Sequence, residues 1–243
     1  RVLAADVIAD HPKLDVLFCN AGITDPVHRV TPEGFEHHVV TCHLAHFLLT
    51  HLLLDSLLAA APSRIILISS EAHKSGDGLD LDDLNNANLW PTNGEPSNNA
   101  AFAAYHRAKL SNLYFMAELV RRLAGTGITV NAISPGFFVN TSIYRNLTGV
   151  FLWGARLVFG VGSLFGLNTP ERSARTYEWL ATDAALATTS GHYFQHLKEL
   201  ETSPAARDRE AAVRLWAWSA AQTGVGELSP ESPSADAADS GAD

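Results

Sequence analysis

The sequence predicts an α/β fold built on a doubly wound parallel sheet. Three short segments are apolar along most of their length rather than on alternate residues: "LDVLFCN" (14–20), "RIILISS" (64–70) and "ITVNAIS" (128–134). Strands of this kind are buried on both faces, which is typical of parallel sheets. Long segments with helical periodicity separate them, as the crossovers of a parallel sheet require. We therefore expect helices on both faces of the sheet.

The other elements follow from local signals. Residues 1–11 begin directly in a helical pattern, so we expect the chain to lack its natural N-terminus. Thr169 is a good N-cap and Pro170 suits the first helical position, which predicts a helix over 169–186. A short fourth strand is expected at 191–194. Further helices are predicted at 32–62, closed by Pro62, at 100–125, closed by Gly125, and at 205–221.

Composition restricts the class of protein. The chain of 243 residues, 47% of them apolar, is long enough for one domain with a sizeable core. We place this domain at 1–222 and predict that 223–243, rich in Ser, Pro, Ala and Asp, is a disordered acidic tail. The net charge of −9, without a basic stripe, excludes nucleic acid as a partner. Cys19 and Cys42 lie in apolar segments, which favours a reducing compartment.

Three polar or Gly/Pro-bearing segments follow the three strands: "CNAG", "SSEAH" and "SPG". In a parallel sheet such loops meet at the carboxyl edge of the strands, where ligands bind. Tyr105 and Lys109, four residues apart on a helix, share one side of it. Lowering the pKa of a phenol by about three units requires roughly 4 kcal/mol, and an ammonium about 5 Å away supplies roughly 3 kcal/mol. With Ser70 to orient a substrate oxygen, this predicts proton transfer coupled to hydride transfer with a nicotinamide.

These motifs resemble the short-chain dehydrogenase/reductase family, and in particular its retinol dehydrogenase-like and WW-domain-containing oxidoreductase-like branch. The matching residues are "CNAG" (19–22), "ISS" (68–70), "YHRAK" (105–109) and "SPG" (134–136), each following the expected element. The resemblance implies a Rossmann-like fold and NADP or NAD as cofactor. It also implies interconversion of an alcohol and a carbonyl on a lipophilic, retinoid- or steroid-like substrate. A location on the cytoplasmic side of a membrane of the endoplasmic reticulum or mitochondrion is implied for the full-length protein.

The resemblance also assigns roles. Tyr105 is expected to be the general acid and base, Lys109 to lower its pKa and hold the nicotinamide ribose, and Ser70 to orient the substrate. Ser69 is expected to point back into the fold. The remaining cofactor-binding residues implied are Asn20, Ala21, Gly22, Pro135, Gly136 and Thr141. In the family a hydroxyl residue four positions after the glycine usually meets the nicotinamide carboxamide. Asn140 stands at that position here, and Thr141 follows it.

Two departures from the family pattern affect these expectations. The family has an asparagine that helps to hold a relay water, and Cys42 stands in its place, with Ala45 in place of a glycine. A thiol is a weak hydrogen-bonding substitute. The alternative function is therefore a binding or signalling module with little turnover.

The second departure concerns the phosphate-binding turn. The chain contains no Gly-x-x-x-Gly-x-Gly turn, which in the family belongs to the first strands. We expect a truncated sheet in which the strand at 14–20 exposes an apolar edge. The chain alone is then expected to be inactive, to bind dinucleotide poorly and to aggregate.

Other chemistry is not favoured. Cys42 and the nearby histidines have workable metal-ligand spacing, but no Asp or Glu clusters with them, so we predict no metal. Ser70 with His73 lacks the glycine pattern of a hydrolase nucleophile. Segment 149–167 is apolar but holds Arg156 and five glycines. We interpret it as a lid over the substrate that also contacts a membrane surface, rather than as a transmembrane span. Oligomerisation is compatible with the sequence.

Overall fold

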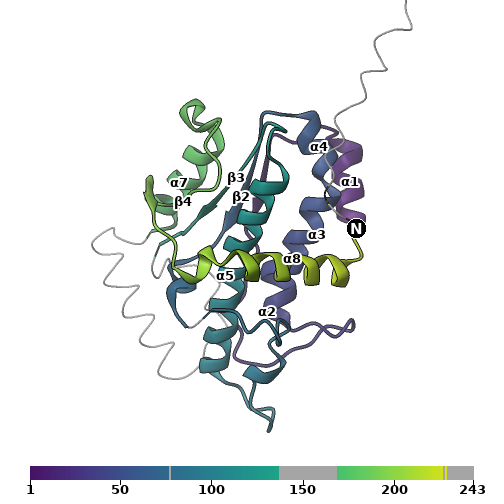
Figure 1. The fold of residues 1–243 in the computed structure, drawn as a ribbon, viewed down its shortest axis with the longest axis vertical. Helices are drawn as coiled ribbons and strands as arrows, with labels where there is room; N and C mark the ends of the chain where they lie inside the picture. The colour runs from purple at the N-terminus through teal and green to yellow at the C-terminus, as the bar shows by residue number, and fades with distance from the viewer. Residues whose placement is uncertain (77, 137–168, 227, 229–243) are drawn as a thin grey trace, which may run out of the picture.

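The computed structural model describes residues 1–76, 78–136, 169–226 and 228. The described residues form one sheet in the order β1-β2-β3-β4-β5 (Figure 1). The first four strands are parallel, and β5 is antiparallel to β4. This is the predicted α/β architecture. The strand bounds are β1 Val16–Cys19, β2 Ser63–Ile68, β3 Ile128–Ile133, β4 Tyr193–Gln195 and β5 Lys198–Leu200.

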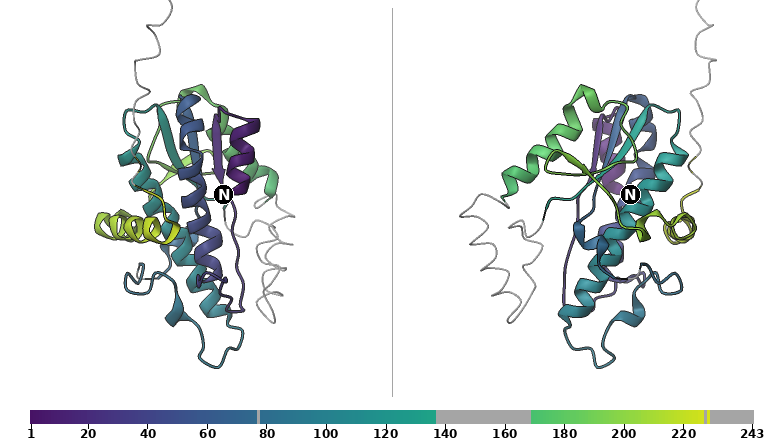
Figure 2. Two further views of the ribbon diagram at one scale, coloured as in Figure 1. Left: turned by 90° about the vertical axis from the view of Figure 1, so that its right-hand side faces the viewer. Right: turned by 60° about the vertical axis from the view of Figure 1, so that its left-hand side comes forward.

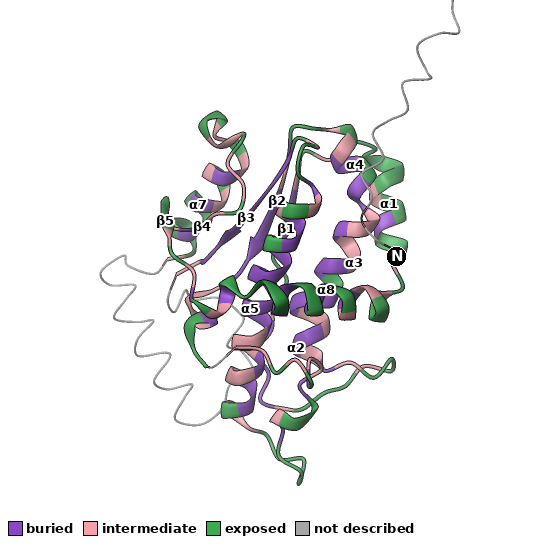
Figure 3. Ribbon diagram, viewed as in Figure 1, coloured by how far each residue is buried: buried purple, intermediate pink, exposed green. Residues whose placement is uncertain are grey.

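The central strands are buried on both faces, as their sequences predict (Figure 3). Ile65 and Leu67 of β2 face the larger core, which includes Phe47 and Leu113 from the helices on that side. The alternate residues of β2 pack with Leu180 in a smaller core on the opposite face. Figure 2 shows α5 and α7 on opposite sides of the strands. The sheet is therefore doubly wound.

Helices occupy most of the predicted segments. Side-chain caps begin α5 at Ser97, α7 at Thr169 and α8 at Asp208, because each accepts a hydrogen bond from an N–H in the first turn. Gly224, with φ of 63°, ends α8. The longer helices are α1 Val2–Asp10, α3 Ala45–Leu52, α4 Leu54–Ala59, α5 Asn98–Arg122, α7 Pro170–Thr182 and α8 Arg209–Thr223. Short 3₁₀ turns lie at Glu71–Lys74, Ala87–Leu89, Ala184–Leu186 and Ala205–Arg207.

The helix predicted at 32–62 differs in its start and its continuity. It begins at α2 (His37–Val39), because the Glu36 carboxylate caps the N–H groups of His38 and Val39. A π-helical turn over Val40–Leu44 follows and leads into α3. The helix is interrupted at Leu53, where φ is −100° and ψ is 5°. Residues 32–36 instead belong to a loop closed by a bridge between Val30 and Glu36.

The hairpin of β4 and β5 was only half predicted. Strand β4 corresponds to the predicted strand at 191–194, but β5 had no sequence signal. The turn places His196 and Leu197 at φ of 50° and 62°. Two-residue turns of this kind favour Asn and Gly, so His-Leu gave no indication of a hairpin.

Strand β1 lies at one edge of the sheet, as predicted, and among the described residues it pairs only with β2. Apolar side chains are exposed near this edge: Phe18 of β1 is 36% exposed, and Leu3 of α1 is 65% exposed. No helix in the described part of the chain is long and apolar enough to cross a membrane. The predicted lid at 149–167 lies outside the described residues, as does most of the predicted acidic tail.

Two histidines of the interrupted helix are buried and titrate abnormally. His43 and His46 are 2% and 4% exposed. Burial lowers the pKa of His43 to about 3 and of His46 to about 4, and the Lys109 ammonium acts in the same direction on His46. Both rings are therefore neutral in the folded chain at pH 5, whereas they are protonated in the unfolded chain. Stability is therefore lost as the pH falls below the unfolded-state pKa near 6.5, towards the folded values.

We predict that His46→Gln flattens this pH dependence. In the native chain each of the two histidines should remove about 2 kcal/mol of unfolding free energy between roughly pH 7.5 and 5. The variant should lose about 2 kcal/mol less over that interval, whatever its stability at pH 7.5. Urea unfolding at both pH values measures the difference, with His43→Gln as the matched second variant. Equal pH dependence in native chain and variants would contradict the prediction.

Candidate active site

A cleft of about 590 Å³ opens at the carboxyl ends of β1 and β2 and beside the loop that follows β3. The described residues lining it come mainly from the segments that follow β1, β2 and β3, from α5 and from α7. They are Asn20, Ala21, Gly22, Thr41, Ile68, Ser69, Tyr105, Lys109, Pro135, Pro170, Ser173, Ala174 and Tyr177. Six of the residues predicted to form the site therefore meet in one cleft. Ser70 and Gly136 each adjoin a lining residue in the chain, and Thr141 lies outside the described residues.

The Lys109 side chain is the buried centre of this cleft. It is 2% exposed, and its Nζ donates a hydrogen bond to the Ile68 carbonyl at 2.8 Å. The same nitrogen lies 5.4 Å from the centroid of the Tyr105 ring. Burial lowers the pKa of Lys109, and the neighbouring Cys42 raises it. The phenol and the ammonium thus share one side of α5, as their spacing predicts.

The two serines after β2 point in different directions. Ser69 is fully buried, and its hydroxyl donates to the Lys109 carbonyl at 2.8 Å, so it points into the fold as expected. Ser70 is half-buried, and its Oγ accepts a hydrogen bond from the Ala72 N–H at 3.2 Å. The Ser70 hydroxyl proton is not used in that bond and is available to an acceptor.

Sequence reasoning missed several residues of the site. Asn112, one turn beyond Tyr105 and Lys109 on α5, donates to the same Ile68 carbonyl at 3.0 Å. Ser173 of α7 donates its hydroxyl proton to the Pro135 carbonyl, which fixes the start of α7 against the loop after β3. Only the tertiary docking of α7 brings Ser173 and Tyr177 to the cleft. Their i, i+4 spacing was the one available signal, and it is ordinary for a helix.

Tyr177 illustrates why a cleft tyrosine is not by itself an acid–base group. Its ring stacks on Phe18 with centroids 5.8 Å apart. Burial raises the pKa of Tyr177 to about 12. Tyr105 differs in its surroundings, because the buried Lys109 Nζ lies 5.4 Å from the centroid of its ring.

Cys42 packs beside the cleft with Ile23 and Ala108 and is fully buried. Its Sγ lies 4.0 Å from the Ile23 carbonyl, a weak contact. Burial raises the pKa of Cys42, and Lys109 opposes this in part. The side chain is therefore a neutral thiol at pH 7.

Two histidines near Cys42, His38 and His43, form hydrogen bonds within the fold. His38 makes a 2.7 Å contact with Glu36 and accepts from the Asp25 N–H, and His43 bonds to Ser219. No group of three or more His, Cys, Asp or Glu side chains in the described part of the chain is placed to hold a metal ion.

Comparison with known proteins identifies sequences that this chain resembles. A family model described as short chain dehydrogenase matches residues 1–78. Over 228 residues, 93% of this chain, the sequence is 42% identical to human retinol dehydrogenase 13. The chain is therefore similar to the short-chain dehydrogenases. It spans 65% of the length of that human relative.

Two further similarities are in the same direction. The WW domain-containing oxidoreductase of Danio rerio is 38% identical over 84% of this chain, which spans 47% of that protein. Among solved structures, a putative uncharacterized protein from Mycobacterium paratuberculosis superposes with a TM-score of 0.62 at 28% identity. That match covers 91% of this chain and 72% of the solved one.

We predict that neither cysteine of this chain reacts with a thiol reagent in the native state. Both are free and buried, and burial raises the pKa of Cys19 to about 12, so thiolate is scarce as well as inaccessible. Labelling with a chromogenic disulfide should be at least about 100-fold slower in buffer than in guanidinium, where both thiols should react. Rapid native labelling of Cys42 would show that the region beside Lys109 opens readily.

Proposed function

We propose that this chain carries the catalytic residues of an NAD(P)-dependent oxidoreductase that interconverts an alcohol and a carbonyl on a lipophilic, retinoid- or steroid-like substrate. The observation that carries the proposal is the buried Lys109 ammonium over the Tyr105 ring, in a cleft at the carboxyl edge of a parallel sheet. The names of the retinol dehydrogenase relatives support the substrate class. The domain that carries this site is proposed at 1–222 with a separate tail at 223–243, but in the described residues α8 continues to Thr223, and Val225 and Leu228 pack against the larger core.

The residues present fit the nicotinamide end of NAD or NADP. Ile68, Pro135 and Ala174 give the cleft apolar surface for a flat ring, and Lys109 with Thr41 provides polar groups suited to a ribose. When bound, the nicotinamide supplies or accepts the hydride. The turn at Asn20, Ala21 and Gly22 would support it from one side, and Pro135 and Gly136 from the other.

The chain's own residues would handle the proton. In carbonyl reduction Tyr105 donates its hydroxyl proton to the substrate oxygen, and in alcohol oxidation the phenolate accepts it. Lys109 stabilises the phenolate, and its burial strengthens that attraction because the local dielectric is low. The Ser70 hydroxyl donates a hydrogen bond to the substrate oxygen and orients it. In carbonyl reduction the substrate would thus receive its proton from Tyr105 and its hydride from the nicotinamide.

A second candidate is a short-chain dehydrogenase-like binding or signalling module with little turnover. The weak 4.0 Å contact of Cys42 favours it, because a thiol holds a relay water poorly. Both proposals place the full-length protein on the cytoplasmic side of a membrane of the endoplasmic reticulum or mitochondrion, where lipophilic substrates are found. Segment 149–167 is proposed to contact that membrane. The protein is also proposed to associate with a second copy of itself.

We predict that Tyr105→Phe lowers kcat/KM for a lipophilic aldehyde by at least about 100-fold, because it removes the proton donor. Tyr114→Phe is the matched control: it makes the same change on the same helix, where the hydroxyl bonds only to the Ala205 carbonyl among described partners. The control should stay within about threefold of native. Oxidation of reduced nicotinamide, followed by absorbance in the full-length protein, measures both. Equal losses in the two variants, or no native activity on any aldehyde or alcohol, would reject the proposed function.

We predict that Cys42→Asn changes kcat by less than about threefold, since the thiol does not line the cleft. Cys42→Ala is made in parallel, so that loss of the thiol is separated from gain of the amide. A tenfold or greater rise in kcat for the asparagine variant alone would support the low-turnover module instead. The same absorbance assay distinguishes these outcomes.

A further inference from the structure

His73 lies three residues after Ser70, in the 3₁₀ turn Glu71–Lys74, and is 2% exposed. Its Nδ1 lies 2.6 Å from the Ser70 carbonyl oxygen, which can only accept, so Nδ1 carries the proton. Its Nε2 lies 3.1 Å from the backbone N–H of Ser203, which can only donate, so Nε2 is unprotonated. These two bonds together fix one neutral tautomer of the ring.

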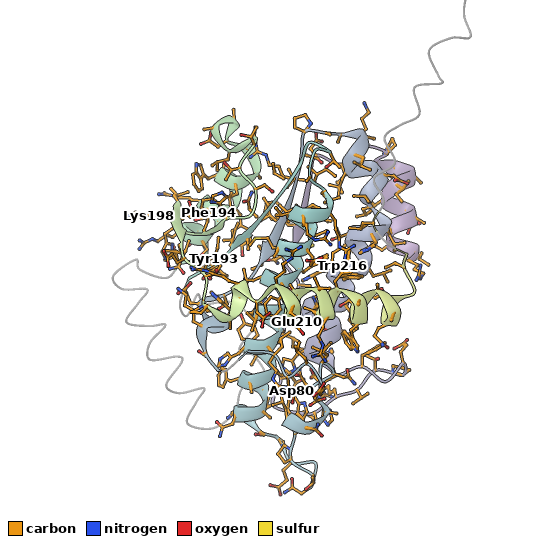
Figure 4. All side chains as sticks on the ribbon, in the orientation of Figure 1. Asp80, Tyr193, Phe194, Lys198, Glu210 and Trp216 are labelled. Carbon is orange, nitrogen blue, oxygen red and sulfur yellow. The ribbon has the colours of Figure 1, made fainter. Side chains whose placement is uncertain are left out.

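The surroundings of His73 hold it in that position. The Tyr193 ring of β4 stands edge-on to it, with centroids 5.2 Å apart and an interplanar angle of 86°. Tyr193, labelled in Figure 4, is 1% exposed and donates its hydroxyl proton to Glu71 at 2.9 Å. The other Glu71 oxygen accepts from Lys74 at 2.8 Å. The turn that follows Ser70 is thus tied to β4 and to the loop before α8.

Ser70 needs such support because it lies beyond the strand. Strand β2 ends at Ile68, and Ser69 makes the last bond to β3, between its N–H and the Ile133 carbonyl at 2.8 Å. The Ser70 carbonyl instead accepts from the backbone N–H and the ring of His73, at 3.0 and 2.6 Å. The orientation of the Ser70 backbone, and with it the direction of its hydroxyl, therefore depends on the ring.

We propose that His73 is a positioning residue that holds Ser70 in its working orientation, and that it does so only while its ring is neutral. The inference rests on the proposed role of Ser70 in orienting the substrate. A proton added at Nε2 would face the Ser203 N–H, so two donors would oppose each other and the bond would be lost. The charged ring, without a partner at Nε2, would then leave its buried site, and its Nδ1 bond to the Ser70 carbonyl would be lost with it.

The burial of the His73 ring and the charges around it determine the pH at which the ring is protonated. Burial lowers the pKa of His73, the bond to the Ser70 carbonyl and the Glu71 carboxylate raise it, and Lys74 lowers it. From β4, Tyr193 presents a phenol whose pKa is raised mainly by burial. The net direction is downward, so the ring is neutral at pH 7. Turnover that depends on Ser70 should fall as the pH drops through the His73 titration.

Two variants separate the two bonds of the ring. In His73→Asn the amide nitrogen occupies the place of Nδ1 and keeps the bond to Ser70, without a titratable group. In His73→Gln the amide oxygen reaches the place of Nε2 and keeps the bond to Ser203. We expect His73→Asn to retain kcat within about threefold and to lose the acid limb of the kcat profile. We expect His73→Gln to lower kcat at least about tenfold at pH 7.5.

A double-mutant cycle with Ser70→Ala completes the test in the full-length protein, since that change keeps the backbone carbonyl. If His73 acts through Ser70, His73→Gln should lower kcat by less than about twofold in the Ser70→Ala background. Independent, multiplying losses would overturn the inference, as would an acid limb unchanged in His73→Asn. Native kcat in Ser70→Ala alone would instead refute the proposed role of the serine. Thermal unfolding of each variant shows that the losses are not losses of folded protein.

Discussion

The site depends on one buried cation. The Lys109 ammonium is removed from water, and such a charge is tolerated only where polar groups replace its hydration. The Ile68 carbonyl does so, and because it stands at the end of β2, the hydrogen bond fixes α5 relative to the carboxyl edge of the sheet. Asn112 bonds to the same oxygen one turn along α5. The Tyr105 ring is therefore placed over the cleft by a contact that also joins helix to strand.

Most of the sheet and about half of the cleft could be predicted from the sequence. The sheet was predicted from the hydrophobicity of its strands, and the cleft from residue spacing and short motifs. Strands β2 and β3 are apolar on both faces because both faces are covered, so their sequences carry the signal. Tyr105 and Lys109 were found because their spacing on one helix is a local property. Ser173 and Tyr177 were not found, because they reach the cleft only through the packing of α7 across the sheet. The hairpin of β4 and β5 was missed because His196 and Leu197 take a left-handed conformation that their side chains do not favour.

The histidines show how far composition can mislead. Their density around Cys42 invites a metal-site interpretation, yet the described rings serve as hydrogen-bonding and packing groups in a largely apolar interior. His43 bonds to Ser219 of α8 and stands edge-on to the Phe115 ring, and the His51 ring lies 4.3 Å from that of Phe47. Burial keeps the His43 ring neutral, so it behaves as an aromatic residue with one polar edge. Their placement links α8 to the interrupted helix rather than to any ligand.

The bond between Ser173 and the Pro135 carbonyl has a consequence for how this protein can diverge. It clamps the point where the chain leaves the sheet after β3 to the point where it returns in α7, so the intervening stretch starts and finishes at one place. The free-energy cost of closing a loop grows only slowly with its length, by about 0.6 kcal/mol for each doubling. A change in the number of residues between Pro135 and Ser173 would therefore add little to the free-energy cost of closure, and it would leave Tyr105 and Lys109 in place on α5.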